Sequence, residues 1–293
     1  MTKTILAVVD NSQASRGVFK ESLVLASSLR ARLVVISVTP QYEGNMNRFF
    51  MKDFNRQINE PFQEILQETE SYAESLGLKI HTIHRMGKPS DEILAAAADE
   101  HACIILCSSA RESQVERMLI GSTVEELVAG APCDILLLPN QAEIKFNRIL
   151  VGTDGAASSM EAEQRTIDIA LSYGSEVHAV CGIDLPADKS LRYAAAKDAE
   201  QKGRKALAAF AQRANSLEIS THIDLLGTLP EQALSQYARE KKTQLIVLGG
   251  HGNSGMFDMF SSGVAGRTAP LSPCPVLIAK QTSGENCFLR HAE

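Results

Sequence analysis

One strand motif occurs twice in the chain, 144 residues apart. KTILAVVD at residues 3–10 and RILVGTD at residues 148–154 both end in an aspartate. Ala131-Pro132-Cys133 likewise returns as Ser272-Pro273-Cys274, 141 residues later. Repetition over this length indicates a tandem duplication of a whole domain. We therefore expect a first domain over residues 1–142, a second over residues 143–281, and a mobile tail over residues 282–293.

Each repeat alternates short apolar runs with amphipathic stretches. In the first repeat the runs at 3–10, 33–38, 78–84, 102–107 and 134–138 predict strands that are buried on both faces, as in a covered parallel sheet. Residues 41–77 predict a long helical segment that Pro61 breaks, since proline lacks the N–H group that a helix interior needs. The predicted fold class is α/β, with two tandem Rossmann-like domains, each a five-stranded parallel sheet flanked by helices.

Composition excludes several classes of protein. The formal net charge of −6 argues against nucleic-acid binding, which needs a concentrated field of lysine and arginine. No apolar run approaches the roughly 20 residues of a membrane helix. The N-terminal sequence lacks the features of a signal peptide, so we expect a cytoplasmic protein without membrane contact.

The cysteines and histidines show no pattern typical of a metal site or a disulfide. No C-x-x-C pair occurs, and the cysteines lie in or beside apolar runs, which predicts buried thiols. His81 and His84 should face opposite sides of a strand, and the other histidines outside the glycine loop are scattered in the sequence. These patterns predict neither a metal site nor a disulfide. The residues concerned are Cys103, Cys107, Cys133, Cys181, Cys274, Cys287, His101, His178, His222 and His291.

The run from Leu245 to Lys280 predicts a buried strand, a glycine-rich loop, a short helix and another buried strand. Glycines in the loop accept positive φ and let backbone N–H groups approach an anion. Ser261-Ser262-Gly263 can open a helix, whose first N–H groups favour negative charge. Because ligands of open parallel sheets lie beyond the carboxyl ends of the strands, this loop and Asp154 should meet at one edge.

These residues resemble the universal stress protein family in its tandem form, from Lys3 to Lys280. The resemblance rests on the strand ending in aspartate, the final strand after Pro273, and a G-x-x-G, nine residues, G-S/T signature. It implies adenine nucleotide alpha hydrolase-like domains that bind ATP, alone or with Mg²⁺. It also places the phosphates at the signature, the ribose near the aspartate, and adenine against a residue late in the second strand. Carried onto the second domain, these roles fall on Asp154, Gly182, Gly249, Gly252, Ser262 and Gly263, with Ser262-Gly263 in swapped order, and on the neighbouring His251, Ser261 and Val264.

The first domain departs from the signature. It keeps Gly121-Ser122, but residues from Ser108 to Arg111 replace G-x-x-G, while Asp10 and Val38 take the sugar and base positions. One alternative is a degenerate site without nucleotide, because a side chain intrudes where backbone should meet phosphate. The other is a site in which the planar fork of Arg111 binds a phosphate.

Two functions remain open from the sequence. The first is a cytoplasmic stress-response protein that binds ATP or a related adenine nucleotide, mainly in the second domain. The second is a nucleotide-free dimeric scaffold that acts through contacts with an unidentified protein partner. No catalytic residue can be assigned, because the Walker pattern is missing, and at most slow ATP hydrolysis or autophosphorylation is expected. The resemblance also implies that residues 135–138 and 276–279 pair the two domains, and it allows a homodimer.

Overall fold

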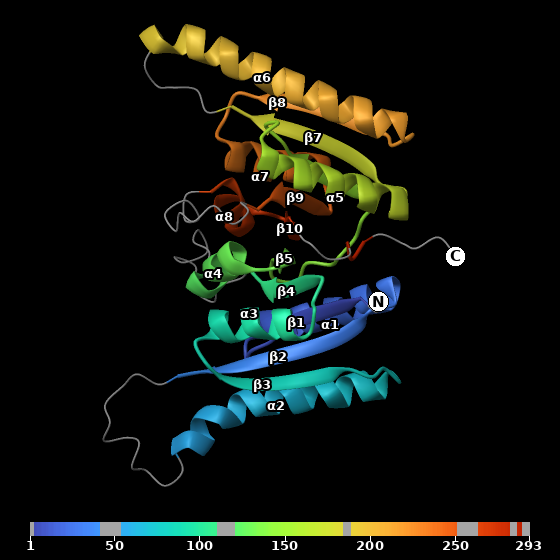
Figure 1. Ribbon diagram of the computed structural model, residues 1–293, viewed down its shortest axis with the longest axis vertical. Helices are drawn as coiled ribbons and strands as arrows, with labels where there is room; N and C mark the ends of the chain where they lie inside the picture. Colours follow the sequence, from blue (N-terminus) through green and yellow to red (C-terminus); the bar gives the residue numbers. More distant parts are fainter. Residues whose placement is uncertain are drawn as a thin grey trace.

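A computed structural model describes residues 3–41, 54–109, 121–183, 189–250, 263–281 and 286–288. Within these residues ten strands form one continuous sheet in the order β3-β2-β1-β4-β5-β10-β9-β6-β7-β8 (Figure 1). Each half is parallel and has the same internal order, so the predicted duplication is visible in the topology. The halves join where β5 and β10 pair antiparallel, with Ile135 opposite Ile278, which confirms the predicted pairing.

The elements alternate along both halves. In the first half they are β1 (Thr4–Val8), α1 (Gln13–Leu29), β2 (Arg32–Pro40), α2 (Phe54–Ser75), β3 (His81–Gly87), α3 (Pro89–Asp99), β4 (Ile104–Ser108), α4 (Ser122–Gly130) and β5 (Asp134–Leu138). In the second half they are β6 (Arg148–Gly152), α5 (Ala157–Tyr173), β7 (Glu176–Gly182), α6 (Lys189–Ser216), β8 (Thr221–Leu226), α7 (Pro230–Lys241), β9 (Leu245–Gly249), α8 (Val264–Thr268), a 3-10 turn (Ala269–Leu271) and β10 (Val276–Ala279).

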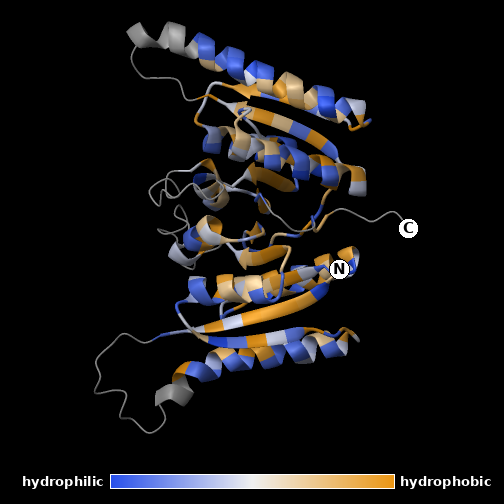
Figure 2. Ribbon diagram, in the orientation of Figure 1, coloured by the Kyte–Doolittle hydropathy of each residue, from blue (hydrophilic) through white to orange (hydrophobic). Residues whose placement is uncertain are grey.

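Two apolar layers hold the sheet between its helices. Successive strand residues point to opposite faces, so Ile5 packs toward α1 and α2 while Leu6 packs toward α3 and α4. The second half repeats this, with α5 and α6 on one face and α7 and α8 on the other. Figure 2 shows the central strands as predominantly hydrophobic and the outermost β3 and β8 as mixed. In the described part of the chain, no helix is long and apolar enough to cross a membrane.

Two local predictions in the first domain are corrected. Helix α2 continues through Pro61 instead of breaking there, because proline removes one backbone hydrogen bond and the remaining turns still pack on the sheet. The third strand begins at His81 and not at Leu78. The amide of Leu78 instead donates to Ala73 O at 3.0 Å and closes the end of α2 after Gly77, whose φ is +70°.

The end of the chain is also corrected. Residues 286–288 pack on the protein, with the Phe288 ring fully buried beside Phe146 at 5.8 Å between centroids. Cys287 forms a disulfide with Cys103, which lies between α3 and β4, so these two are not the free thiols predicted. Sequence patterns missed this pair because 184 residues separate its members. The remaining four cysteines are free and buried, as predicted.

Candidate functional site

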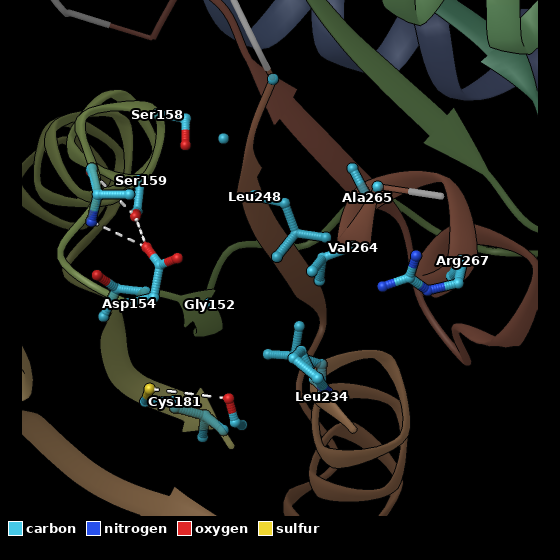
Figure 3. A pocket seen from close by; sticks show the side chains of 18 of the residues that line it. Gly152, Asp154, Ser158, Ser159, Cys181, Leu234, Leu248, Val264, Ala265 and Arg267 are labelled. Atoms are coloured by element: carbon cyan, nitrogen blue, oxygen red, sulfur yellow. Dashed lines mark hydrogen bonds between the residues drawn. The ribbon is translucent and has the colours of Figure 1, made fainter. Parts of the chain in front are cut away.

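A cavity of about 390 Å³ opens at the carboxyl ends of β6, β7 and β9. This is where the order of the second half reverses, since β7 and β9 lie on opposite sides of β6. Open α/β sheets bind ligands at this position. Figure 3 shows that Asp154 and Ser159 border one side of the cavity and Arg267 the other, with Leu234, Leu248 and Val264 between them.

Asp154 follows β6 and is held by the start of α5. Its Oδ1 accepts a hydrogen bond from the amide of Ala156 at 2.9 Å and another from the hydroxyl of Ser159. The carboxylate is thus fixed at the cavity rim while it remains exposed to solvent. Asp10 makes the same turn in the first domain, accepting from the amide of Ser12 at 2.9 Å. A fixed, exposed carboxylate can accept hydrogen bonds from hydroxyl groups of a ligand.

The glycines at the strand ends are required for close packing and not for unusual backbone angles. A Cβ on Gly249 would lie 1.8 Å from the carbonyl oxygen of Ser158, and one on Gly182 would lie 2.6 Å from Cα of Pro230. Neither Gly249 nor Gly250 has a positive φ, which corrects the reason given from the sequence. The amide of Gly250 donates to Ala279 O at 2.8 Å, so it is not available to an anion.

The starts of α4 and α8 change how Ser262-Gly263 aligns with Gly121-Ser122, which the sequence analysis read as a pair in swapped order. Gly263 caps α8 with φ −69° and ψ 150°, and Gly121 caps α4 with φ −69° and ψ 146°. The two glycines are therefore counterparts, and Val264 takes the position of Ser122. Nine residues separate Arg111 from Gly121, whereas ten separate Gly252 from Gly263. The second domain thus has a loop one residue longer and lacks the hydroxyl at the first helical position.

Arg267 is a cavity residue that the sequence analysis missed. It lies on α8, and its Nε is 3.1 Å from Glu231 Oε1 at the start of α7. Its terminal nitrogens extend toward the cavity in Figure 3. At the corresponding helix contact of the first domain, Glu126 of α4 accepts a hydrogen bond from Ser90 and pairs with Lys88 at 2.6 Å. The charge on the helix after the loop is therefore positive in the second domain and negative in the first.

The remaining predicted residues divide into two groups. Val38 and Ser108 occupy the first-domain positions of Gly182 and Gly249, and Val38 is buried in the core. Arg111, His251, Gly252, Ser261 and Ser262 lie outside the described residues. The described part of the site therefore consists of Asp154, Gly182, Gly249, Gly263 and Val264, together with the additional Leu234, Leu248 and Arg267.

Comparisons with known proteins show the family and the fold of the chain. The sequence model of the universal stress protein family matches residues 1–139 and again residues 145–280. The chain belongs to the universal stress protein family. A universal stress protein of Methanocaldococcus jannaschii is 30% identical over 146 residues, which are 48% of this chain and 85% of that protein. The crystal structure of a universal stress protein from Archaeoglobus fulgidus DSM 4304 superposes with a TM-score of 0.74 at 19% identity, covering 96% of this chain and 97% of that one.

The sequence analysis expected the histidines of this universal stress protein to be scattered, but two of them lie together. His178 on β7 and His222 on β8 are directly paired in the strand register, with their rings stacked 4.9 Å apart. Both lie near Glu176. They were missed because 44 residues separate them in the sequence and only the pairing of β7 with β8 brings them together.

The free thiols should be inert in the folded protein. Burial raises the pKa of Cys107 and Cys133 to about 12 and that of Cys181, at the cavity, to about 11. At pH 8 each is then thiolate in about one molecule per thousand or fewer, and the thiolate is the reactive form. We expect a thiol reagent such as DTNB to label none of the four free cysteines natively and all four after denaturation. Rapid labelling of the native protein would contradict this burial.

Proposed function

We propose that the second domain of this universal stress protein binds ATP or a related adenine nucleotide in the cytoplasm. The observation that carries the proposal is the cavity at the reversal point, which has a carboxylate at one side, an arginine at the other and apolar side chains between. Its volume of about 390 Å³ falls within the range of small-molecule sites, about 300–1,000 Å³. Charge of both signs around an apolar centre suits a ligand with a base, hydroxyl groups and phosphates.

Each class of cavity residue matches one part of such a ligand. The Asp154 carboxylate would accept hydrogen bonds from ribose hydroxyls. Gly182, Leu234 and Leu248 would line the adenine. The first amides of α8 have no partner within the helix, and with the guanidinium fork of Arg267 they would face the phosphates. ATP would bind alone or with Mg²⁺, and we propose no catalytic residue.

The first domain is a poorer site for an anion. Glu125 stands at the helix position of Arg267, and the next residue, Glu126, adds a second negative charge whose pKa is lowered by the hydrogen bond from Lys88. Val38 fills the counterpart of Gly182 with a buried side chain. This difference supports a single principal site in the second domain.

Replacing Arg267 by methionine should lower ATP affinity about 10- to 100-fold, because hydrogen bonds to charged groups contribute about 1.5–3 kcal/mol. Adenosine, which has no phosphates, should lose little affinity. Calorimetric titration of both ligands with Mg²⁺ present measures the difference, and Arg267→Lys should retain part of the ATP affinity. Arg16→Met is a matched control, since Arg16 forms an exposed ion pair with Glu68 in the first domain.

A stability measurement tests the proposal as a whole. A ligand at 100 times its Kd stabilises the native state by about 2.7 kcal/mol, so ATP should raise the unfolding midpoint by several degrees. Failure of millimolar ATP to shift the midpoint, together with no copurified nucleotide, would contradict nucleotide binding and favour the scaffold. The association of two chains and the protein partner stay predictions from the family resemblance, and sedimentation of the purified protein tests the first of them.

A further inference from the structure

A second cluster of ligating side chains lies at the opposite edge of the same sheet, near the amino ends of β7 and β8. Glu176 and His178 are two residues apart on β7 and face the same side, and His222 of β8 is directly opposite His178. Glu176 Oε1 lies 3.1 Å from His178 Nε2 and 3.2 Å from His222 Nε2. One ligand atom from each residue lies within 4.8 Å of the other two.

Hydrogen bonds determine which nitrogen of His178 carries a hydrogen. The hydroxyl of Tyr237 donates to Asp224 Oδ2 at 2.7 Å, since an ionised carboxylate can only accept. The same hydroxyl lies 2.9 Å from His178 Nδ1. Because its hydrogen is engaged with Asp224, the hydroxyl accepts from Nδ1–H. In the neutral ring the lone pair of His178 is therefore on Nε2, and it faces the carboxylate oxygen of Glu176.

Two acceptor atoms that face each other at 3.1 Å need a cation between them. Typical zinc bonds of about 2.0–2.2 Å to nitrogen and oxygen place neighbouring ligands of a tetrahedral site about 3.3 Å apart. Both Glu176–histidine distances are close to this value. The ligand nitrogens of the two histidines lie within 4.8 Å of each other and must come to about 3.3 Å, and His222 can move because its side chain is 57% exposed.

We propose that Glu176, His178 and His222 bind a divalent transition-metal ion, with Zn²⁺ as the ion that suits two imidazoles and a carboxylate. Tyr237 and Asp224 supply the outer contacts that metal-bound histidines use to fix their ring orientation. Arg148 holds the second oxygen of Glu176, with Nε 2.9 Å from Oε2, and leaves Oε1 to the metal. All three proposed ligands line a second cavity of about 370 Å³, which Lys241 and Lys242 also line and which has room for a fourth ligand.

The first domain provides an internal comparison. His81 of β3 is opposite Val34 of β2, just as His222 is opposite His178. At the positions of Glu176, Asp224 and Tyr237 the first repeat has Arg32, Ile83 and Ala96. The first domain thus has a counterpart of His222 but no counterpart of His178, Glu176, Asp224 or Tyr237, so it should not hold the ion.

The test uses the full chain, freed of any affinity tag and stripped with EDTA. Titration with Zn²⁺ should show one site per chain, and Co²⁺ should give the visible absorption of a bound ion. His222→Ala should lose at least tenfold in Zn²⁺ affinity, whereas His81→Ala should bind as the unmodified protein does. Both histidines are exposed, with side-chain exposures of 57% and 54%, so neither change should affect folding in EDTA.

A second variant tests the outer contact. Tyr237→Phe keeps the packing but removes the acceptor for His178 Nδ1–H, and it should weaken Zn²⁺ binding about 10- to 100-fold. The proposal is overturned if the unmodified protein shows no site, which would leave a proton as the bridging cation. It is also overturned if the His81 and His222 variants lose zinc equally. ATP titrations at the other edge of the sheet are read separately, so either site can fail without the other.

Discussion

Replacing Gly249 by alanine should lower the free energy of unfolding by about 3 kcal/mol and abolish nucleotide binding. The added Cβ would lie 1.8 Å from Ser158 O and 2.5 Å from its carbonyl carbon. Both atoms belong to backbone at the start of α5, so a change of rotamer cannot relieve the overlap, and overpacking of ordinary cores already costs about 1–3 kcal/mol. The start of α5 must move away from β9, and it carries Ser159, which holds Asp154. Urea denaturation and ATP titration measure the two effects.

Gly17→Ala is the matched control for this change. Gly17 lies in the second turn of α1 in the first domain, and nothing lies within 4 Å of the position of an added Cβ. Alanine is a better helix former than glycine, so this variant should gain roughly 0.5–1 kcal/mol. A Gly249→Ala protein that retained both stability and nucleotide affinity would show that β9 and α5 do not need their close contact.

The architecture could be predicted from the sequence because the deciding signals are local and occur twice. Continuous apolar runs predicted the strands, and the repeated aspartate motif predicted two domains of one topology. Errors arose where neighbouring elements decided the outcome. Leu78 forms a hydrogen bond with the end of α2 instead of starting a strand. Residues 286–288 are held on the protein by the disulfide between Cys287 and Cys103.

The sequence analysis named Asp154 and the glycines that border the cavity, but it did not name Arg267. The glycines stand in a recognisable order, whereas Arg267 is one arginine in a short helix, and only the fold shows that it borders the cavity. The nine-residue spacing of the signature also gave a wrong alignment of the two domains. Ten residues lie between Gly252 and Gly263, so counting nine paired Gly121 with Ser262 instead of Gly263. Helix capping corrected this register, since Gly121 and Gly263 have matching backbone angles.

The Arg165→Met variant should lose about 3–5 kcal/mol of stability at pH 7. Arg165 of α5 reaches across the junction of the domains to Asp134 of β5. Its Nε lies 2.6 Å from Oδ2 as an ion pair, and its Nη2 donates a hydrogen bond of 3.2 Å to Oδ1. Asp134 is only 1% exposed, so removing the arginine leaves a buried charge without its counter-ion, which is among the costliest single changes. Urea denaturation of the full chain measures the loss. As a control, Arg204→Met removes an exposed pair on α6 and should cost less than about 1 kcal/mol.

Protonation of Asp134 should reverse much of this loss. Burial raises the pKa of Asp134, while Arg165 acts in the opposite direction, so the variant should have a still higher pKa at this group. A carboxyl group whose pKa is raised by folding stabilises the native state below its unfolded pKa of about 3.9, and this contribution is lost as the pH rises through the folded pKa. The deficit of Arg165→Met relative to the unmodified protein should therefore shrink between pH 7 and pH 4.

The double variant Asp134→Asn with Arg165→Met distinguishes an unpaired charge from lost packing. Asparagine keeps an oxygen that can accept from the amide of Lys280, which now donates to Asp134 Oδ1 at 2.9 Å. The double variant buries no charge, so it should be more stable than Arg165→Met alone. Replacing both members of a buried ion pair by uncharged groups often changes the free energy of unfolding little. If the double variant is as unstable as the single one, the arginine acts through its packing. Since Asp134 belongs to the first domain and Arg165 to the second, recovery in the double variant would locate the lost stability at the junction between them.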